Sequence, residues 1–260
     1  MAYNDFTFEI VDNHMYAHGV YTMSLKTDMK MPNIIAGQFL HLLIPDRPDL
    51  TLRRPFCICG FYNNIVSILY AVVGKGTAAM ADLKEGTLIK GMMPLGNGFI
   101  LKEKHKNIAL IGGGIGVAPL LPVPKSYPNR RYRAYLGYQS SAGMLFVPEF
   151  AVASKEIYVS TDDGTFGFAG FPTDVLKEHI RDGYKPDVIL TCGPEPMLRA
   201  VKNIAETHNI EAYMSGENRM GCGFGACLVC TCAVMGDNGE YHNLRACADG
   251  PVFDLKKVKL

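Results

Sequence analysis

Residues 107–119 read NIALIGGGIGVAP, an apolar run that passes directly into a string of glycines. The run has the length and composition of a buried strand, and the glycines after it predict a tight turn. The pattern of the chain changes here, because short β-prone runs precede the stretch and strands that alternate with helices follow it. The stretch therefore marks the boundary between two parts of different fold class.

After this boundary, the alternation of predicted strands and helices defines residues 102–214. The candidate strands are NIALIGG, RAYLGY, EIYVST, DVILTC and EAYMS. Pro194 suits the first turn of the clearest helix, in which apolar residues recur at helical spacing from Met197 to Ala205. A second helix is predicted over residues 172–181, again opened by a proline. This alternation predicts an α/β domain with an open, largely parallel sheet that binds ligands at the carboxyl ends of its strands.

Before the boundary, residues 1–101 contain short β-prone runs separated by turn residues. The runs are FTFEIV, HGVYTMSL, QFLHLLIP, IVSILYAVV and GTLIKGMMP, and one short helix is predicted at TAAMADL. Strands at this spacing predict an antiparallel barrel or sandwich. The segment RRPFCI, residues 53–58, begins a further strand, where an arginine can pair with a phosphate. Two arginines before a strand are nevertheless more often a solvated edge.

The glycine string reads G-x-G-x-G-x-x-P from Gly112 to Pro119, which departs from the strict dinucleotide fingerprint. The physical logic is the same, because a tight turn lets a pyrophosphate approach main-chain N–H groups at a helix N-terminus. The alternative is a purely structural turn. The segment Thr191-Cys192-Gly193-Pro194 ends another strand at the same edge, where the Cys192 thiol would meet a nicotinamide. Taken alone, such a cysteine is more often a core residue.

The choice of nucleotide rests on the segment LGYQSSAGM, residues 136–144. It holds no arginine or lysine for a 2′-phosphate, which favours NAD over NADP, although it also lacks an acidic residue for the ribose. Asp162 and Asp163 are candidates for ribose or nicotinamide contacts, and the alternative for both is a solvated turn.

The stretch MGCGFGACLVCTC, residues 220–232, contains four of the eight cysteines. Cys222, Cys227 and Cys230 are spaced C-x4-C-x2-C, and Cys247 follows after a further sixteen residues. This is the plant-type arrangement for a 2Fe–2S cluster held by four thiolates. The core of such a cluster is anionic, so main-chain N–H groups must turn toward its sulfurs, and glycines permit the positive φ that this wrapping demands: Gly221, Gly223 and Gly225.

A zinc site and a set of unliganded thiols are the alternatives to a cluster. Structural zinc sites usually pair two C-x2-C knuckles, and this chain has one such pair. Cys232 is left over and is expected to pack as a small apolar residue. We therefore expect residues 215–260 to form a small cysteine-rich segment that binds a 2Fe–2S cluster.

The composition and charge of the chain limit the classes of partner that it is expected to bind. Apolar residues make up 48% and charged residues 20% of the 260, and the formal net charge is +1, so neither nucleic acid nor an acidic membrane surface is an expected partner. No apolar run reaches the roughly 18 residues of a membrane span, and the N-terminus does not resemble a signal peptide. The expected location is the cytoplasm, where clustered cysteines are more often ligands or catalytic groups than disulfides.

Six motifs in order resemble the ferredoxin-reductase superfamily and, more narrowly, the electron transfer subunits of type B dihydroorotate dehydrogenase: RRPFCI, GKGT, PLGNGF, GGGIGVAP, TCGPEPM, and RMGCGFGACLVC with CADGPVF beyond it. The resemblance covers nearly the whole chain. It implies an FAD-binding β-barrel, an NAD-binding α/β domain and a 2Fe–2S segment, in that order.

The resemblance also implies roles for particular residues. FAD would be held by Arg54, Pro55, Phe56, Cys57, Leu69, Tyr70, Ala71, Gly76 and Thr77. The nicotinamide nucleotide would be held by Gly112, Gly113, Gly114, Gly116, Pro119, Gly193 and Pro194, with Cys192 as the catalytic residue. Cys222, Cys227, Cys230 and Cys247 would ligate the cluster.

The implied activity is electron transfer in pyrimidine biosynthesis. Dihydroorotate would reduce FMN in a separate catalytic subunit, electrons would pass singly through the cluster to FAD, and NAD⁺ would leave as NADH. The implied assembly is a heterotetramer with two copies of each subunit. The alternatives are an electron transfer subunit of another oxidoreductase, of the sulfide dehydrogenase or ferredoxin reductase type, and a non-enzymatic zinc-bearing interaction module.

Three positions depart from the family pattern. Cys57 stands where a hydroxyl residue is expected, and a thiol is a weaker hydrogen-bond donor. Ala71 replaces a basic residue, which would remove one phosphate contact. Pro122 and Pro124 interrupt the helix expected after GVAPLL, so we expect irregular structure there and weaker NAD binding than in relatives.

Overall fold

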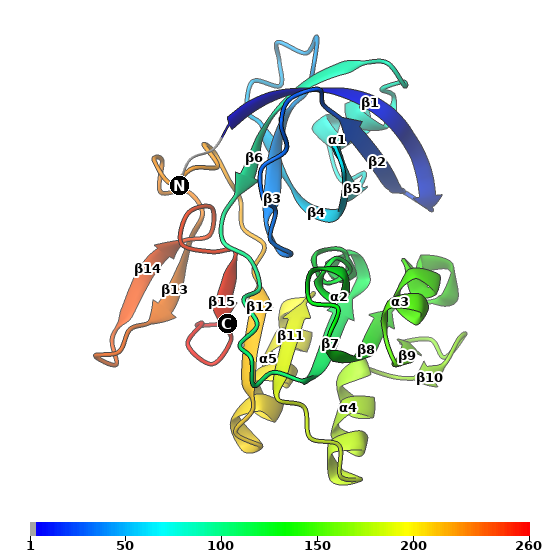
Figure 1. Ribbon diagram of the computed structural model, residues 1–260, viewed down its shortest axis with the longest axis vertical. Coiled ribbons are helices and arrows are strands. Elements are labelled where there is room, and N and C mark those ends of the chain that lie inside the picture. The colour runs from blue at the N-terminus through cyan, green and yellow to red at the C-terminus, as the bar shows by residue number, and fades with distance from the viewer. Residues whose placement is uncertain (1–3) are drawn as a thin grey trace.

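The structure is a computed structural model that describes residues 4–260. A β-barrel lies at one end of the molecule, an α/β domain lies at the other, and a two-stranded hairpin from the C-terminal segment lies to the side (Figure 1). This arrangement confirms the predicted fold class. Among the described residues, no helix has the length and apolar character needed to cross a membrane.

Six antiparallel strands close the barrel in the order β1-β2-β5-β4-β3-β6. Their interior is apolar because side chains alternate along each strand, and Phe8, Leu40 and Leu42 project into the core. Helix α1 packs against this core through Met80. The elements are β1 (Asn4–Ala17), β2 (Val20–Lys26), β3 (Phe39–Leu43), β4 (Arg54–Tyr62), β5 (Ile65–Ala71), α1 (Lys75–Ala81) and β6 (Leu88–Leu95).

A seven-stranded sheet forms the α/β domain in the order β10-β9-β8-β7-β11-β12-β15. All its pairs are parallel except β12 with β15. The chain runs outward from β7 in one direction and from β11 in the other, so the switch point for ligand binding lies between these two strands. The strands are β7 (Asn107–Gly113), β8 (Arg131–Tyr138), β9 (Glu156–Thr161), β10 (Phe168–Ala169), β11 (Val188–Cys192), β12 (Glu211–Ser215) and β15 (Val252–Asp254).

The two long helices of this domain form where the sequence predicted them. Helix α4 spans Pro172–Arg181 and begins at its proline, as predicted. Helix α5 spans Glu195–Thr207, and the predicted first-turn proline is corrected, because Pro194 is the N-cap and Pro196 lies in the first turn. Between β7 and β8 the prolines have the expected effect, because only a 3-10 turn η1 (Gly114–Leu120) and a four-residue α2 (Val123–Ser126) form. Three short elements of this domain were not predicted: η2 (Ser141–Gly143), α3 (Val147–Ala153) and β10.

The C-terminal segment is joined to both larger parts. Its hairpin consists of β13 (Thr231–Met235) and β14 (Tyr241–Arg245), which the sequence analysis did not predict. The turn Asp237-Asn238-Gly239 between them is a strong local hairpin signal. The last strand, β15, extends the α/β sheet by pairing with β12. The cysteine-rich segment is thereby anchored to the same sheet that carries the glycine turn.

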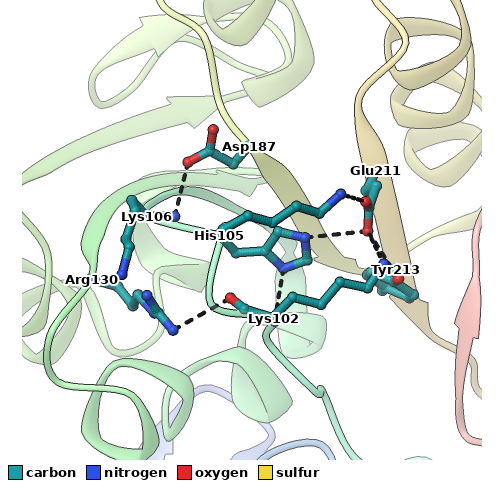
Figure 2. Close-up of polar contacts among 8 residues, drawn as sticks. Lys102, His105, Lys106, Arg130, Asp187, Glu211 and Tyr213 are labelled. Carbon is teal, nitrogen blue, oxygen red and sulfur yellow. Dashed lines mark hydrogen bonds and ion pairs between the residues drawn. The ribbon is translucent and has the colours of Figure 1, made fainter.

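A charged network holds residues 102–106, the linker between the barrel and the sheet, in place (Figure 2). Glu211, the first residue of β12, accepts hydrogen bonds from Lys104 and, at 2.7 Å, from Lys102. The buried ring of His105 lies 3.2 Å from the same carboxylate, and the Tyr213 hydroxyl donates to it at 3.3 Å. Hydrogen bonds from Lys102 and Lys104 lower the pKa of Glu211 to about 2.

Replacing Glu211 with glutamine should destabilise the cofactor-free chain by about 1–2 kcal/mol at pH 7. Because the folded pKa is about 2 and the ordinary value is 4.5, this contribution is fully present above pH 4.5 and is lost as the pH falls toward 2. Urea unfolding at several pH values measures the difference between wild type and Glu211→Gln. The exposed Glu206→Gln on α5 should show no such pH-dependent difference, and a Glu211→Gln effect that persists at pH 2 would argue against the network.

Candidate functional site

The four predicted cluster ligands lie in two pairs. In the first loop, the N–H of Cys222 donates to Cys227 Sγ at 3.4 Å. In the second pair, the N–H of Cys247 donates to Cys230 Sγ at 3.4 Å, and the two thiols hydrogen-bond each other. Cys247 also interacts electrostatically with Cys222, so the two pairs lie near each other.

The hairpin explains how Cys247 reaches Cys230 across sixteen intervening residues. Thr231 pairs with Arg245 in the ladder, and the N–H of Ala246 donates to the Cys230 carbonyl at 2.8 Å. The two ligands therefore sit just beyond the open end of the β13–β14 hairpin. Cys232, the second residue of β13, is half-buried, and burial raises its pKa to about 11.

Main-chain N–H groups turn toward the sulfurs as the glycine spacing predicts. Gly223 and Gly225 have φ of +82° and +94°, whereas Gly221 has no positive φ. Burial by itself would raise the pKa of Cys222, but N–H groups of Phe224, Cys227 and Ala226, with the Cys227 thiol, lower that pKa to about 6. The loop is therefore built to stabilise negative charge on sulfur before any metal is bound.

This arrangement fits a two-iron cluster. A 2Fe–2S cluster takes two thiolates on each iron, which matches two adjacent cysteine pairs with N–H donors around them. The residues present therefore fit this cluster.

A side-chain clamp ties the ligand segments to each other and to the barrel. Arg245 pairs with both carboxylate oxygens of Asp249 at 2.8 and 2.9 Å, and its third nitrogen donates to the Gly225 carbonyl at 3.1 Å. Asn97, in the motif PLGNGF, donates to the carbonyls of Asp249 and Val252 at 3.0 and 2.9 Å. Val252 N–H donates back to Asn97 at 2.9 Å. The sequence analysis assigned no role to Asn97, because its partners are more than a hundred residues away along the chain.

The predicted flavin residues lie along β4, at the end of β5 and in α1. Gly76 packs directly on the Arg54 guanidinium, because a Cβ at Gly76 would lie 2.6 Å from Arg54 Nε. Arg54 also donates to the carbonyls of Leu50, at 3.1 Å, and Leu52. The Thr77 hydroxyl accepts hydrogen bonds from the N–H groups of Val73 and Gly74, which precede α1, at 2.9 and 3.2 Å. A guanidinium held in place by these contacts can pair with a phosphate group.

The remaining flavin candidates contribute differently. Tyr70 is buried, and its hydroxyl donates to Asn13 in the barrel core at 2.8 Å. Leu69 is likewise buried, so these two residues can offer only main-chain groups to a ligand. Ala71 ends β5 opposite Val20, and Phe56 packs edge-on against Tyr70 with ring centroids 5.8 Å apart.

Replacing Arg54 with glutamine should weaken FAD binding about 10–100-fold, since a hydrogen bond to a charged group contributes about 1.5–3 kcal/mol. Titrating FAD into the flavin-free protein, with flavin fluorescence as the signal, measures this. Arg47→Gln is a matched control, because the side chain of Arg47 is exposed and pairs with the nearby Asp49. Equal FAD affinity in wild type and Arg54→Gln would contradict the assignment.

A cavity of about 620 Å³ opens at the carboxyl edge of the sheet beside the glycine turn. Gly113, Gly114, Asp162 and Pro194 line it, whereas Asp163 lies in a turn and accepts hydrogen bonds from Thr165. The other predicted residues of this site, Gly112, Gly116, Pro119 and Gly193, shape the turns behind it. The lining includes residues that the sequence analysis did not single out: Lys177, Thr173 and Phe171.

Cys57 and Cys192 meet at the boundary between barrel and sheet. Burial raises the pKa of Cys57 to about 12, and burial together with Cys57 raises that of Cys192. Glu217 lies near both sulfurs, and Ser215 hydrogen-bonds Cys192. Both thiols are therefore protonated at neutral pH, so Cys192 can orient a ligand but does not supply a thiolate nucleophile.

Comparison with known proteins agrees with this geometry. Residues 217–259 match the model for the iron-sulfur cluster binding domain of dihydroorotate dehydrogenase B. The electron transfer subunit of dihydroorotate dehydrogenase B (NAD(+)) from Bacillus velezensis is 39% identical over 257 residues, which cover 96% of this chain and 97% of that protein. The chain belongs to the family of dihydroorotate dehydrogenase B electron transfer subunits. Its member from Clostridium acetobutylicum is 38% identical over 245 residues, 94% of this chain and 93% of that one.

Solved structures extend the likeness of this chain to other reductases. A structure of NADH-dependent reduced ferredoxin-NADP oxidoreductase matches with a TM-score of 0.86 and 26% identity, over 97% of this chain and 89% of that one. Phthalate dioxygenase reductase matches with a TM-score of 0.65 at 18% identity, over 94% of this chain and 77% of that one, and shares the fold.

Proposed function

We infer that this chain is the electron transfer subunit of an NAD-dependent dihydroorotate dehydrogenase in pyrimidine biosynthesis, and that it delivers to NAD⁺ the electrons that a partner removes from dihydroorotate. The observation that carries this inference is the pairing of four cysteines around N–H donors, in a chain that aligns over 96% of its length with named members of the family. The chain is thus an oxidoreductase component with FAD, a 2Fe–2S cluster and NAD as cofactors.

Each unit of the chain has a proposed task. Residues 1–101 hold FAD through the Arg54–Cys57 strand, Leu69–Ala71 and the Gly76-Thr77 turn. Residues 102–214 hold NAD along Gly112–Pro119 and Cys192–Pro194, and residues 215–260 hold the cluster through Cys222, Cys227, Cys230 and Cys247. A flavin exchanges both hydride and single electrons, which neither a nicotinamide nor an iron–sulfur cluster does alone.

The residues of this chain orient these groups and exclude water from them. Cys57 and Cys192 bring the end of β11 against the flavin strand, so that a nicotinamide bound at the glycine turn would face the flavin. Their protonated thiols add no negative charge of their own where a nicotinamide would meet the flavin. Lys177 lies beside the nucleotide cavity, where its ammonium group can approach a phosphate.

The proposed partner is an FMN-containing catalytic subunit, assembled with this chain as a heterotetramer of two of each in the cytoplasm. Leu228 and Val229, next to the ligand Cys230, are 62% and 56% exposed, which suits a protein interface beside the cluster. All eight cysteines are free of disulfides, as thiols that must bind iron in a reducing compartment would be.

A second candidate is an electron transfer subunit of a ferredoxin reductase. The TM-score of 0.86 to the ferredoxin-NADP oxidoreductase favours it as an alternative, although the identity of 26% is lower than the 39% to the dihydroorotate dehydrogenase B subunit.

Reconstitution separates the two candidates. The chain is purified anaerobically together with the FMN subunit encoded in the same genome, and NADH formation from dihydroorotate and NAD⁺ is followed at 340 nm. We expect NADH formation that requires both subunits. Reduction of ferredoxin without any dihydroorotate-dependent NADH would favour the reductase instead.

A further inference from the structure

His41 is a buried histidine on the outer face of the barrel. It pairs in register with Pro55 of β4 and is 0% exposed. Its neighbours Leu40 and Leu42 project into the barrel core, so His41 projects outward, because side chains alternate along a strand. Paired residues of antiparallel strands project to the same face. His41 and Pro55 therefore share the outer face of the barrel.

The cluster loop lies directly on the imidazole. A Cβ at Gly223 would lie 2.4 Å from His41 Nδ1 and 3.0 Å from Cε1, so only glycine permits this approach. Gly223 follows the ligand Cys222, and the ring also lies close to the main chain of Cys222. On its other side the ring lies close to the main chain of Arg53, immediately before β4. A single side chain thus spans from the cluster loop to the flavin strand.

Neither nitrogen of His41 makes a well-formed hydrogen bond within residues 4–260. A buried polar group without a partner costs free energy, and a leucine of similar size would fill the same space without that cost. The imidazole is therefore better explained by what it offers the ligand loop than by packing alone.

We propose that His41 is a positioning residue for electron transfer between the cluster and the flavin, an inference that rests on the function proposed above. Its ring sets how closely the Cys222 loop approaches β4. It thereby holds in place the main-chain N–H groups of that loop, which donate to the sulfurs of Cys222 and Cys227. The step that it serves moves one electron and forms or breaks no bond. Hydrogen bonds to sulfur stabilise the reduced form of a cluster and raise its reduction potential.

His41→Leu tests this in the anaerobically purified chain with FAD and cluster bound. We expect wild-type flavin and iron content, a lower cluster midpoint potential in an EPR-monitored redox titration, and about 10–100-fold slower reduction of the cluster after rapid mixing with NADH. His41→Asn retains an N–H donor, and its potential and rate should lie between those of His41→Leu and wild type.

His105→Leu is the matched control, because His105 is also 0% exposed but lies in the linker against Glu211. It should lower stability and leave the cluster potential and the rate unchanged. The proposal is overturned if His41→Leu has the wild-type potential and rate, or if His105→Leu changes them equally. If His41→Leu does not retain its cluster, the test passes to His41→Asn. A wild-type cluster potential and reduction rate in His41→Asn would then overturn the proposal. A wild-type chain without iron or flavin would instead refute the proposed function.

Discussion

Cys227→Ser should abolish electron transfer from dihydroorotate to NAD⁺ while leaving the flavin reaction with NADH intact. Cys227 is the exposed one of the four predicted ligands, so its replacement should disturb the cluster without disturbing a core. Mutation of a residue that hydrogen-bonds a metal ligand typically lowers metal affinity or activity about 10–100-fold. Replacement of a ligand itself should lower them further. The measurements are iron content, dihydroorotate-dependent NADH formation with the partner subunit, and NADH-dependent reduction of an artificial two-electron acceptor.

Cys232→Ser is the matched control for this prediction. Cys232 belongs to the same segment, but it lies within β13 beyond the ligand pair at the end of the hairpin. This variant should retain iron and both activities. The ligand assignment would be wrong if Cys227→Ser kept its iron and its transfer rate while Cys232→Ser lost them.

Gly116→Ala should weaken NADH binding, which is the second-largest effect that we expect. A Cβ at Gly116 would lie 2.5 Å from the Cys192 carbonyl oxygen and 2.8 Å from Gly193 Cα. These are main-chain atoms of the second turn, which cannot move aside as a flexible side chain can. Overpacking of this kind costs about 1–3 kcal/mol, which corresponds to roughly 10–100-fold weaker NADH binding. FAD and iron content should be unchanged.

Gly143→Ala provides the comparison, because Gly143 lines the same cavity and a Cβ there would meet no atom within 4 Å. The dissociation constant for NADH, measured by quenching of flavin fluorescence, should rise in Gly116→Ala and change little in Gly143→Ala. Equal effects in both variants would mean that the close contact between the two turns does not shape the nucleotide site.

Local sequence signals were sufficient for much of this fold. An opening proline predicted α4 with its observed bounds, and apolar residues at helical spacing predicted α5, whose N-cap is Pro194. Pro122 and Pro124 predicted the break in the helix after the glycine turn, because proline removes a hydrogen-bond donor and clashes within a helix. Weaker NAD binding as a consequence stays a prediction.

Features that depend on distant partners could not be read from the sequence. The pairing of β15 with β12 and the clamp from Asn97 to residues 249–252 join segments whose local patterns carry no record of each other. His41 is part of an ordinary β-prone run, and its contact with Gly223 exists only once the cluster loop folds over the barrel. The β13–β14 hairpin is different, because its Asn-Gly turn was a local signal that the cysteine spacing overshadowed.

Iron, acid-labile sulfide and flavin content of the anaerobically isolated chain test the central claim most directly. The four paired cysteines predict about two iron atoms and about two sulfides per chain, together with about one FAD and no stoichiometric zinc. A colourless protein that contains zinc, or thiols without metal, would contradict the account.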